Sequence, residues 1–328
     1  MTFARPLAMA LWLGAAATGI APPGEDAAAE PRRAFSAGEY ARAAALLDAA
    51  IARDARDASL RYWLARCQYE LNQYDEAEES ARRAVAMDPD NSDYHGWLGR
   101  ALGRRAERAG WLSGFSLARQ VRAEFETAVR LDPRNVQAQR DLIEFYSQAP
   151  GVVGGGADKA RRQVDALAAI DAVEGHLARA AVWANEKMPD RADTEYRAAM
   201  AARPGRAGPY LEAADFYEQR RDPVRMEEAV EAAAALDSAN PQLLYSRGVA
   251  AVLRGGRDAD AERLLRQYLD TVPPRSDLPS KAATREWLGQ LYERQGRPDA
   301  AAEEYRSALQ LDRDRRGARD ALRRLKKS

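Results

Sequence analysis

The sequence predicts an all-α fold, a solenoid of stacked helix-turn-helix units of about 34 residues. The first observation behind this prediction is a regular spacing of small residues. Ala180, Ala214 and Gly248 follow one another at intervals of 34, and each lies inside an apolar helical pattern. Ala65 and Gly99 repeat the same interval. A fixed period of this size indicates a stacked helical array.

The second observation is the pattern inside each unit. After Ala180, the offsets 12, 16, 19 and 24 give Ala192, Tyr196, Ala199 and Pro204. The same offsets recur after Ala65 (Ala77, Ala81, Ala84, Pro89) and after Gly289 (Ala301, Tyr305, Ala308, Arg313). Two antiparallel helices approach closely only where small residues face each other, and larger apolar residues fill the gaps between turns. A proline then ends the second helix and lets the next unit begin.

These residues resemble the repeat of the tetratricopeptide family, whose unit is a 34-residue helix-turn-helix. The resemblance is carried by residues 287–292 (Trp-Leu-Gly-Gln-Leu-Tyr) with Gly296, Ala301, Tyr305 and Ala308, and by Ala65 with Leu71, Tyr74, Ala77, Ala84 and Pro89. It covers roughly residues 35–325. Because packing residues define the family, the resemblance implies a protein-binding solenoid and leaves the partner open.

Residues 1–29 differ from the rest and predict a secretory signal peptide. Arg5 precedes an apolar run over residues 7–20, and Ala27, Ala28 and Ala29 follow. A short positive start, an apolar run and a small-residue end are typical of an export signal. The run is too short for a comfortable bilayer span. We expect cleavage after Ala29 or several residues earlier, and a periplasmic or secreted protein without a stable membrane span; a disordered alanine-rich leader is the alternative.

The repeats predict one continuous solenoid over residues 35–327. A half unit at 35–54 would cap the N-terminal end, about seven repeats would occupy 58–313, and a capping helix at 315–327 would close the stack. A longer linker, residues 273–279, precedes the last repeat. The single cysteine, Cys67, lies near Ala65 and is expected to be packed in the core, without a disulfide framework.

Two repeats are longer than 34 residues. The second has about ten extra residues within 103–117, and the third has about five within 149–156. Insertions in repeat arrays map to loops, often on a binding face, so we expect two loops on one edge. Trp111, Leu112 and Phe115 form either an exposed patch for a partner or a segment folded back onto the third repeat. The lengthened second repeat, together with the glycine-rich turn of the third, resembles a feature of some bacterial exported repeat proteins.

Composition and motifs argue against several functions. The 50 basic and 50 acidic residues balance, so no global field favours nucleic acid. Residues 151–156 are glycine-rich, but Ala157 and Asp158 follow where a phosphate loop needs Lys and Ser or Thr. We expect a wide turn there, with Asp158 capping the next helix. His95 and His176 lie in different repeats without metal-ligand spacing. The sequence predicts no enzyme, no metal and no cofactor.

The first helices of such repeats line a concave groove. Helical projection places these candidate partner-binding residues on it: Tyr62, Arg66, Tyr69, Arg100, Arg140 and Glu144, followed in later repeats by Asp215, Glu218, Gln242, Tyr245 and Gln290. The groove would be more basic at its N-terminal end. The alternative is that these residues are ordinary solvent-exposed positions without a role in binding. We expect Arg66, Arg100 and Arg140 to converge on an acidic segment or a C-terminal carboxylate.

Two functions therefore stay open. The first is a non-enzymatic scaffold or adaptor that binds a segment of a protein partner in the concave groove of the solenoid. The alternative is an architectural protein that acts by self-association in an envelope assembly.

Overall fold

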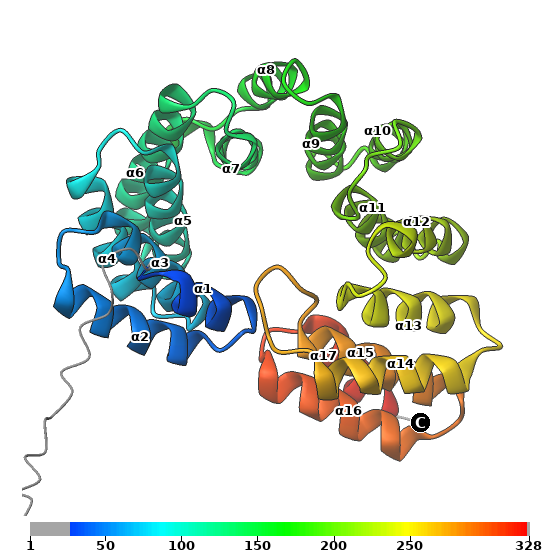
Figure 1. The fold of residues 1–328 in the computed structure, drawn as a ribbon. Coiled ribbons are helices and arrows are strands. Elements are labelled where there is room, and N and C mark those ends of the chain that lie inside the picture. Colours follow the sequence, from blue (N-terminus) through cyan, green and yellow to red (C-terminus); the bar gives the residue numbers. More distant parts are fainter. Residues whose placement is uncertain (1–26, 327–328) are drawn as a thin grey trace, which may run out of the picture.

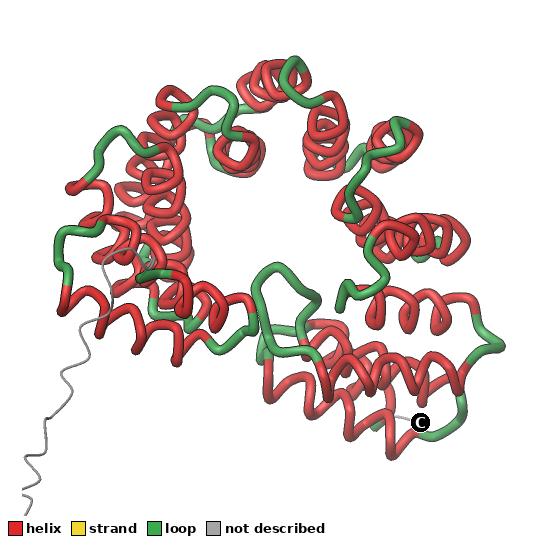
Figure 2. Tube along the Cα trace, viewed as in Figure 1, coloured by secondary structure: helices red, strands yellow, loops and turns green. Residues whose placement is uncertain are grey.

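The computed structural model describes residues 27–326, and the regular structure in that part of the chain is helical throughout (Figure 2). The prediction of an all-α fold is confirmed. None of the helices in this range is long and apolar enough to cross a bilayer. The predicted signal peptide falls mainly on residues 1–26, which lie outside the described residues.

The helices follow one another in pairs along the chain. Their bounds are α1 (Ala29–Ser36), α2 (Tyr40–Arg53), α3 (Ala58–Glu70), α4 (Tyr74–Met87), α5 (Ser92–Arg108), α6 (Trp111–Leu131), α7 (Val136–Gln148), η1 (Gly151–Val153), α8 (Ala157–Ala168), α9 (Ala172–Asn185), α10 (Pro189–Ala201), α11 (Gly208–Gln219), α12 (Pro223–Leu236), α13 (Gln242–Arg254), α14 (Asp258–Thr271), α15 (Lys281–Arg294), α16 (Pro298–Leu311) and α17 (Arg316–Leu325). Helices α3 to α16 form the seven expected pairs, and α17 packs against α15 and α16.

Small residues sit where the two helices of a pair approach most closely. A Cβ placed on Gly289 would lie 2.5 Å from the ring of Tyr305, and one placed on Gly99 would collide with the ring of Phe125. The corresponding alanines are almost fully buried: Ala65, Ala180 and Ala214. The aromatic side chain of one helix thus occupies the space that a small residue leaves on the other, as the spacing predicts.

The N-terminal end contains a helix that the sequence did not predict. Helix α1 packs against α2 and α3, and Ala28 and Ala34 are buried in the same core cluster as Cys67. The first unit is therefore a short helix pair instead of the half unit expected at residues 35–54. The prediction missed α1 because its small residues match a cleavage zone as well as a helix.

The insert of the second repeat is helical, so the predicted loop at residues 103–117 is wrong. Helix α5 has 17 residues and α6 has 21, whereas α3 and α4 have 13 and 14. Only Ala109 and Gly110 connect the two long helices. The extra residues keep an apolar helical period and pair with each other, so extending both helices leaves fewer backbone groups without partners than a loop would.

The glycine-rich insert of the third repeat is a turn, as expected, but its details differ. It contains η1, and Val153 is buried against α6. Asp158 does not cap α8, because the N-cap position is Gly156 and no side chain caps it. The Asp158 carboxylate instead accepts a hydrogen bond from Arg161 at 2.6 Å.

The helix pairs follow an arc that returns to its starting point (Figure 1). The linker between α14 and α15, residues 272–280, reaches the N-terminal repeats there. Ser276 hydrogen-bonds to Glu70 of α3, and a Cβ placed on Gly38 would lie 2.8 Å from Pro273. A cavity of about 1030 Å³ lies between the two sides of this contact. The solenoid is therefore closed into a ring.

Candidate functional site

The odd-numbered helices form the inner wall of the ring. In Figure 1, α7, α9, α11 and α13 lie toward its centre, and their partners α8, α10, α12 and α14 lie outside. Successive odd-numbered helices from α3 to α15 also contact each other. The inner wall is therefore a continuous surface of first helices, in agreement with the concave groove that the sequence predicts.

An aromatic–arginine cluster occupies the N-terminal part of the inner wall. We use this name for Tyr62, Trp63, Arg66, Tyr69, Trp97 and Arg100 of α3 and α5. The guanidinium carbon of Arg66 lies 4.1 Å from the ring centroid of Trp63 and 4.9 Å from that of Trp97. Tyr62 accepts a hydrogen bond of 3.4 Å from Arg66. Within the described residues Arg66 has no carboxylate partner, and its buried Nε has no hydrogen bond. Aromatic faces therefore stabilise this cation.

Trp97 is the central residue of this cluster, and the sequence prediction missed it. Its ring lies 4.9 Å from the Arg66 guanidinium carbon, 4.8 Å from that of Arg100, and 5.6 Å from the ring of Tyr69. The available signal was its place one helical turn before Arg100, on the face that the projection had already assigned to the groove.

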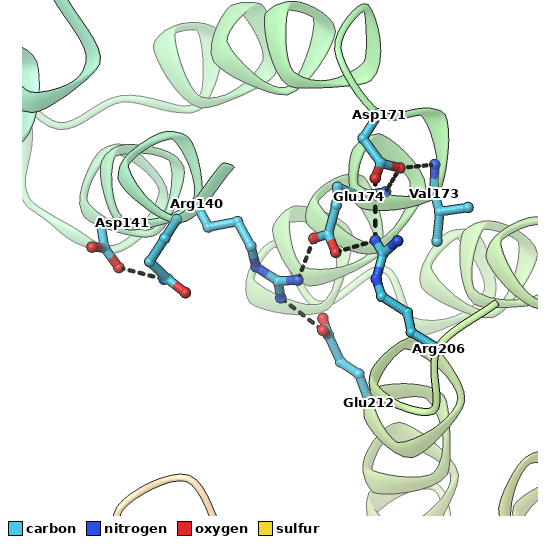
Figure 3. A network of polar contacts seen from close by, with 8 residues as sticks. Arg140, Asp141, Asp171, Val173, Glu174, Arg206 and Glu212 are labelled. Atoms are coloured by element: carbon cyan, nitrogen blue, oxygen red, sulfur yellow. Dashed lines mark hydrogen bonds and ion pairs between the residues drawn. The ribbon is translucent and has the colours of Figure 1, made fainter. Parts of the chain in front are cut away.

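Arg100 and Arg140 are bound to carboxylates of the protein itself. Arg100 makes two hydrogen bonds to Asp141 of α7, at 2.9 and 3.0 Å. Arg140 donates to Glu174 of α9 and to Glu212 of α11, both at 2.7 Å (Figure 3). Burial alone would lower the pKa of Arg140, but Glu212 and Glu174 outweigh it and raise that pKa. These ion pairs connect four consecutive inner helices, α5, α7, α9 and α11.

The expected convergence of Arg66, Arg100 and Arg140 on one anionic ligand is therefore wrong for this structure. Arg66 is enclosed by aromatic rings, and the other two are neutralised by neighbouring repeats. The projection placed these arginines correctly on the inner face. It did not include Asp141 and Glu174, the carboxylates that occupy them.

A groove of about 660 Å³ opens between α7, α9 and α11. We call it the α7–α11 groove. Alanines of α9 line it: Ala178, Ala181 and Ala184. Ile143 and Phe216 provide larger apolar walls from α7 and α11, and Glu144 and Asp215 add carboxylates from the same two helices.

Three carboxylates along the inner wall have no ion-pair partner among residues 27–326. Glu144 accepts a hydrogen bond from Gln148 at 3.2 Å, and Asp215 accepts one from Gln242 at 2.9 Å. Glu218 accepts hydrogen bonds from Tyr245 at 2.7 Å and Trp287 at 2.9 Å. Neutral donors hold these side chains in place without neutralising them.

Burial, together with the nearby carboxylates Glu218 and Glu212, raises the pKa of Asp215 to about 7, and the hydrogen bond from Gln242 opposes the shift. The middle of the inner wall thus carries carboxylates without a cationic partner among the described residues, while the predicted gradient of charge along the groove stays a prediction.

A further cavity, of about 630 Å³, lies beside the aromatic–arginine cluster. Tyr69, Trp97 and Arg100 line it, and Ser276 of the 272–280 linker contributes from across the ring. Phe115, for which the sequence left open an exposed patch or a segment folded back onto the third repeat, is half-buried on α6. The side chains of Trp111 and Leu112 lie outside the described residues.

The two histidines have structural partners. His95 Nδ1 lies 2.6 Å from Glu124, and its Nε2 lies 2.9 Å from the carbonyl oxygen of Pro89. His176 lies 2.7 Å from Glu195. In the described part of the chain, no group of three or more His, Cys, Asp and Glu residues is placed to hold a metal ion.

The stacked hairpins and their inner wall define a helical-repeat solenoid. Two sequence models described as "Tetratricopeptide repeat" match residues 34–101 and 253–321. The chain therefore contains tetratricopeptide repeats near both ends, as the resemblance implied. No curated protein matches the chain.

The chain is also similar to solved structures. The chain is similar to yeast Tom70, with 15% identity and a TM-score of 0.62, over 94% of this chain and 65% of that one. It is also similar to TTC0263, a thermophilic repeat protein of Thermus thermophilus, with 21% identity and a TM-score of 0.49, over 62% of this chain and 97% of that one. The likeness to Tom70, at so low an identity, concerns the fold alone.

Proposed function

We propose that this protein is a non-enzymatic scaffold that binds a segment of another protein along the inner wall of its ring. The observation that carries the proposal is the α7–α11 groove, an open groove of about 660 Å³ on the face where first helices of several repeats meet. Concave surfaces of helical repeats suit extended partners because each repeat adds a similar strip of contact area.

We further propose that the chain is exported through its N-terminal signal peptide to the periplasm or the exterior. Arg5 and the apolar run over residues 7–20 support this proposal. Ala28 is 1% exposed, so cleavage after Ala29 would remove part of a packed core, and we favour a cut before Ala27. Mass spectrometry of the protein from its native cells should find a chain that lacks most of the first 26 residues; an intact Met1 on a cytosolic protein would contradict export.

Site-specific photo-cross-linking in native cells tests the scaffold function. A photoreactive residue replaces Ala181 on the inner wall or, as a matched control, the exposed Glu228 on the outer helix α12. We expect one partner to be cross-linked from position 181 and not from position 228. Equal cross-linking from both positions, or none from position 181, would contradict the proposal. Cross-links only between copies of this chain would favour the architectural alternative.

A further inference from the structure

We propose that the α7–α11 groove binds a cationic segment of a partner protein, with a Lys or Arg side chain paired to Asp215 and a second cationic position near Glu144. The inference rests on the proposed scaffold function and names the chemistry of its partner. It differs from the sequence expectation, which assigned an acidic partner to the N-terminal arginines.

The shape and surface of the groove fit a long cationic side chain. The alanines of α9 (Ala178, Ala181 and Ala184) leave space between α7 and α11. Ile143 and Phe216 border the same space with apolar surface. Lys and Arg bury an aliphatic stem along apolar surface while their charged end reaches a polar group. The groove offers apolar surface for the stem and carboxylates on α7 and α11 for the charged end.

The charges of the groove are not balanced within the protein. The charged side chains that line it are Arg140, Asp141, Glu144, Glu174, Glu212 and Asp215. Arg140 pairs with Glu174 and Glu212, and Arg100 from α5 pairs with Asp141. Glu144 and Asp215 remain without a cation among the described residues. A partner cation would supply the missing charge.

Asp215 is well placed to receive this charge. Its carboxylate is only partly accessible, and Gln242 fixes it with a single hydrogen bond of 2.9 Å. A charge pair is stronger where water is partly excluded than at an open surface. Above pH 7, where Asp215 is ionised, an acidic ligand would meet uncompensated carboxylates on both α7 and α11, so like-charge repulsion disfavours it in this groove.

Peptide binding to the purified mature chain tests the inference. The probe is a fluorescently labelled, end-capped octapeptide of alternating Lys and Ala, and the comparison peptide alternates Glu and Ala. We expect saturable binding of the Lys peptide that weakens with added salt, and no saturable binding of the Glu peptide. Asp215→Asn should weaken the Lys peptide about tenfold, because a charge-assisted hydrogen bond is lost.

Glu228→Gln on α12 is the matched control, since it removes the same charge from an exposed site outside the groove. It should leave the affinity unchanged. An equal loss in Glu228→Gln and Asp215→Asn would show that only the net charge matters and would overturn the proposal, as would saturable binding of the Glu peptide. Glu144→Gln, at an exposed position, gives the same test without a change in the core.

The two proposals fail separately. If a partner cross-links from position 181 and Asp215→Asn leaves its affinity unchanged, the cationic chemistry is wrong and the scaffold function stands. If no partner cross-links but the Lys peptide binds with the expected dependence on Asp215, the groove chemistry stands and the scaffold function is wrong.

Discussion

Ser276 donates two hydrogen bonds to the carboxylate of Glu70, 206 residues earlier in the chain. Its backbone N lies 3.0 Å from Oε2, and its Oγ lies 2.6 Å from Oε1. The 272–280 linker is held in shape by Arg275, which hydrogen-bonds to Asp277 at 2.9 and 2.6 Å. The backbone approaches Pro273 at Gly38, which has a positive φ of 76°. This contact joins the linker to the N-terminal repeats where the arc of helix pairs closes.

Glu70→Ala should open the ring while leaving the repeats folded. The substitution removes both acceptors of Ser276, and the remaining repeats contact only their neighbours, so stability should fall by less than about 1 kcal/mol, as for exposed polar contacts. Small-angle X-ray scattering should show a larger radius of gyration. Glu79→Ala, which breaks only a local pair with Arg83 on α4, should leave the scattering curve unchanged. Identical curves for both variants would show that the Glu70 contact does not hold the ring closed.

Ala214→Leu should destabilise the protein by about 1–3 kcal/mol, because extra methylenes in a packed core force neighbours apart. Ala214 is 0% exposed and lies in α11, which packs against α12. Chemical denaturation monitored by circular dichroism measures the effect. Ala86→Leu, at an exposed position of α4, is the control and should change stability little. An unchanged unfolding midpoint for Ala214→Leu would mean that the repeat register is misassigned.

Asp215 should make the stability of the protein depend on pH between about 4 and about 7. Its pKa in the folded chain is about 7, whereas an unfolded aspartate titrates near pH 4. The folded state therefore binds more protons than the unfolded state in this range, and the unfolding free energy falls as pH rises. The destabilisation is complete above about pH 8, where Asp215 is ionised in the folded chain as well.

Asp215→Asn should remove this dependence and be more stable than the parent at pH 8. The groups that surround Asp215 also titrate or carry charge, namely Glu212 and Glu218 on α11, Arg140 on α7, Tyr196 on α10, Tyr245 on α13 and Tyr268 on α14. The measured quantity is consequently the difference between parent and variant in urea denaturation at each pH. A difference that stays constant from pH 4 to 8 would contradict the raised pKa.

The sequence predicted the repeats well because their packing is local. Gly289 and Tyr305 lie in one repeat, so a fixed offset records their contact. The ring closure between Glu70 and Ser276 depends on small rotations that accumulate over several repeats, and no spacing in the sequence records it. The site shows the same division: Arg100 was placed on the inner wall, but its pairing with Asp141 depends on how one repeat sits on the next.

Arg140 connects three inner helices. Its replacement should therefore affect the stability of the protein more directly than the binding of a partner. Arg140→Met leaves the carboxylates of Glu174 and Glu212 without their shared cation. Glu174 is buried, with 10% of its side chain exposed, and breaking a buried pair from one side leaves an uncompensated charge. Arg140 is itself 29% exposed, and Arg206 still contacts Glu174. We therefore expect the unfolding free energy to fall by about 1–3 kcal/mol, less than for a fully buried pair.

The double variant Arg140→Met with Glu212→Gln tests this cause. Removing the charge of Glu212 along with that of Arg140 should recover part of the lost stability, because less uncompensated charge remains on the inner wall. Urea denaturation of the parent, the two single variants and the double variant forms a complete cycle. If the two effects simply add, Arg140 and Glu212 do not interact in solution, and α7 and α11 are connected through α9, which contacts both.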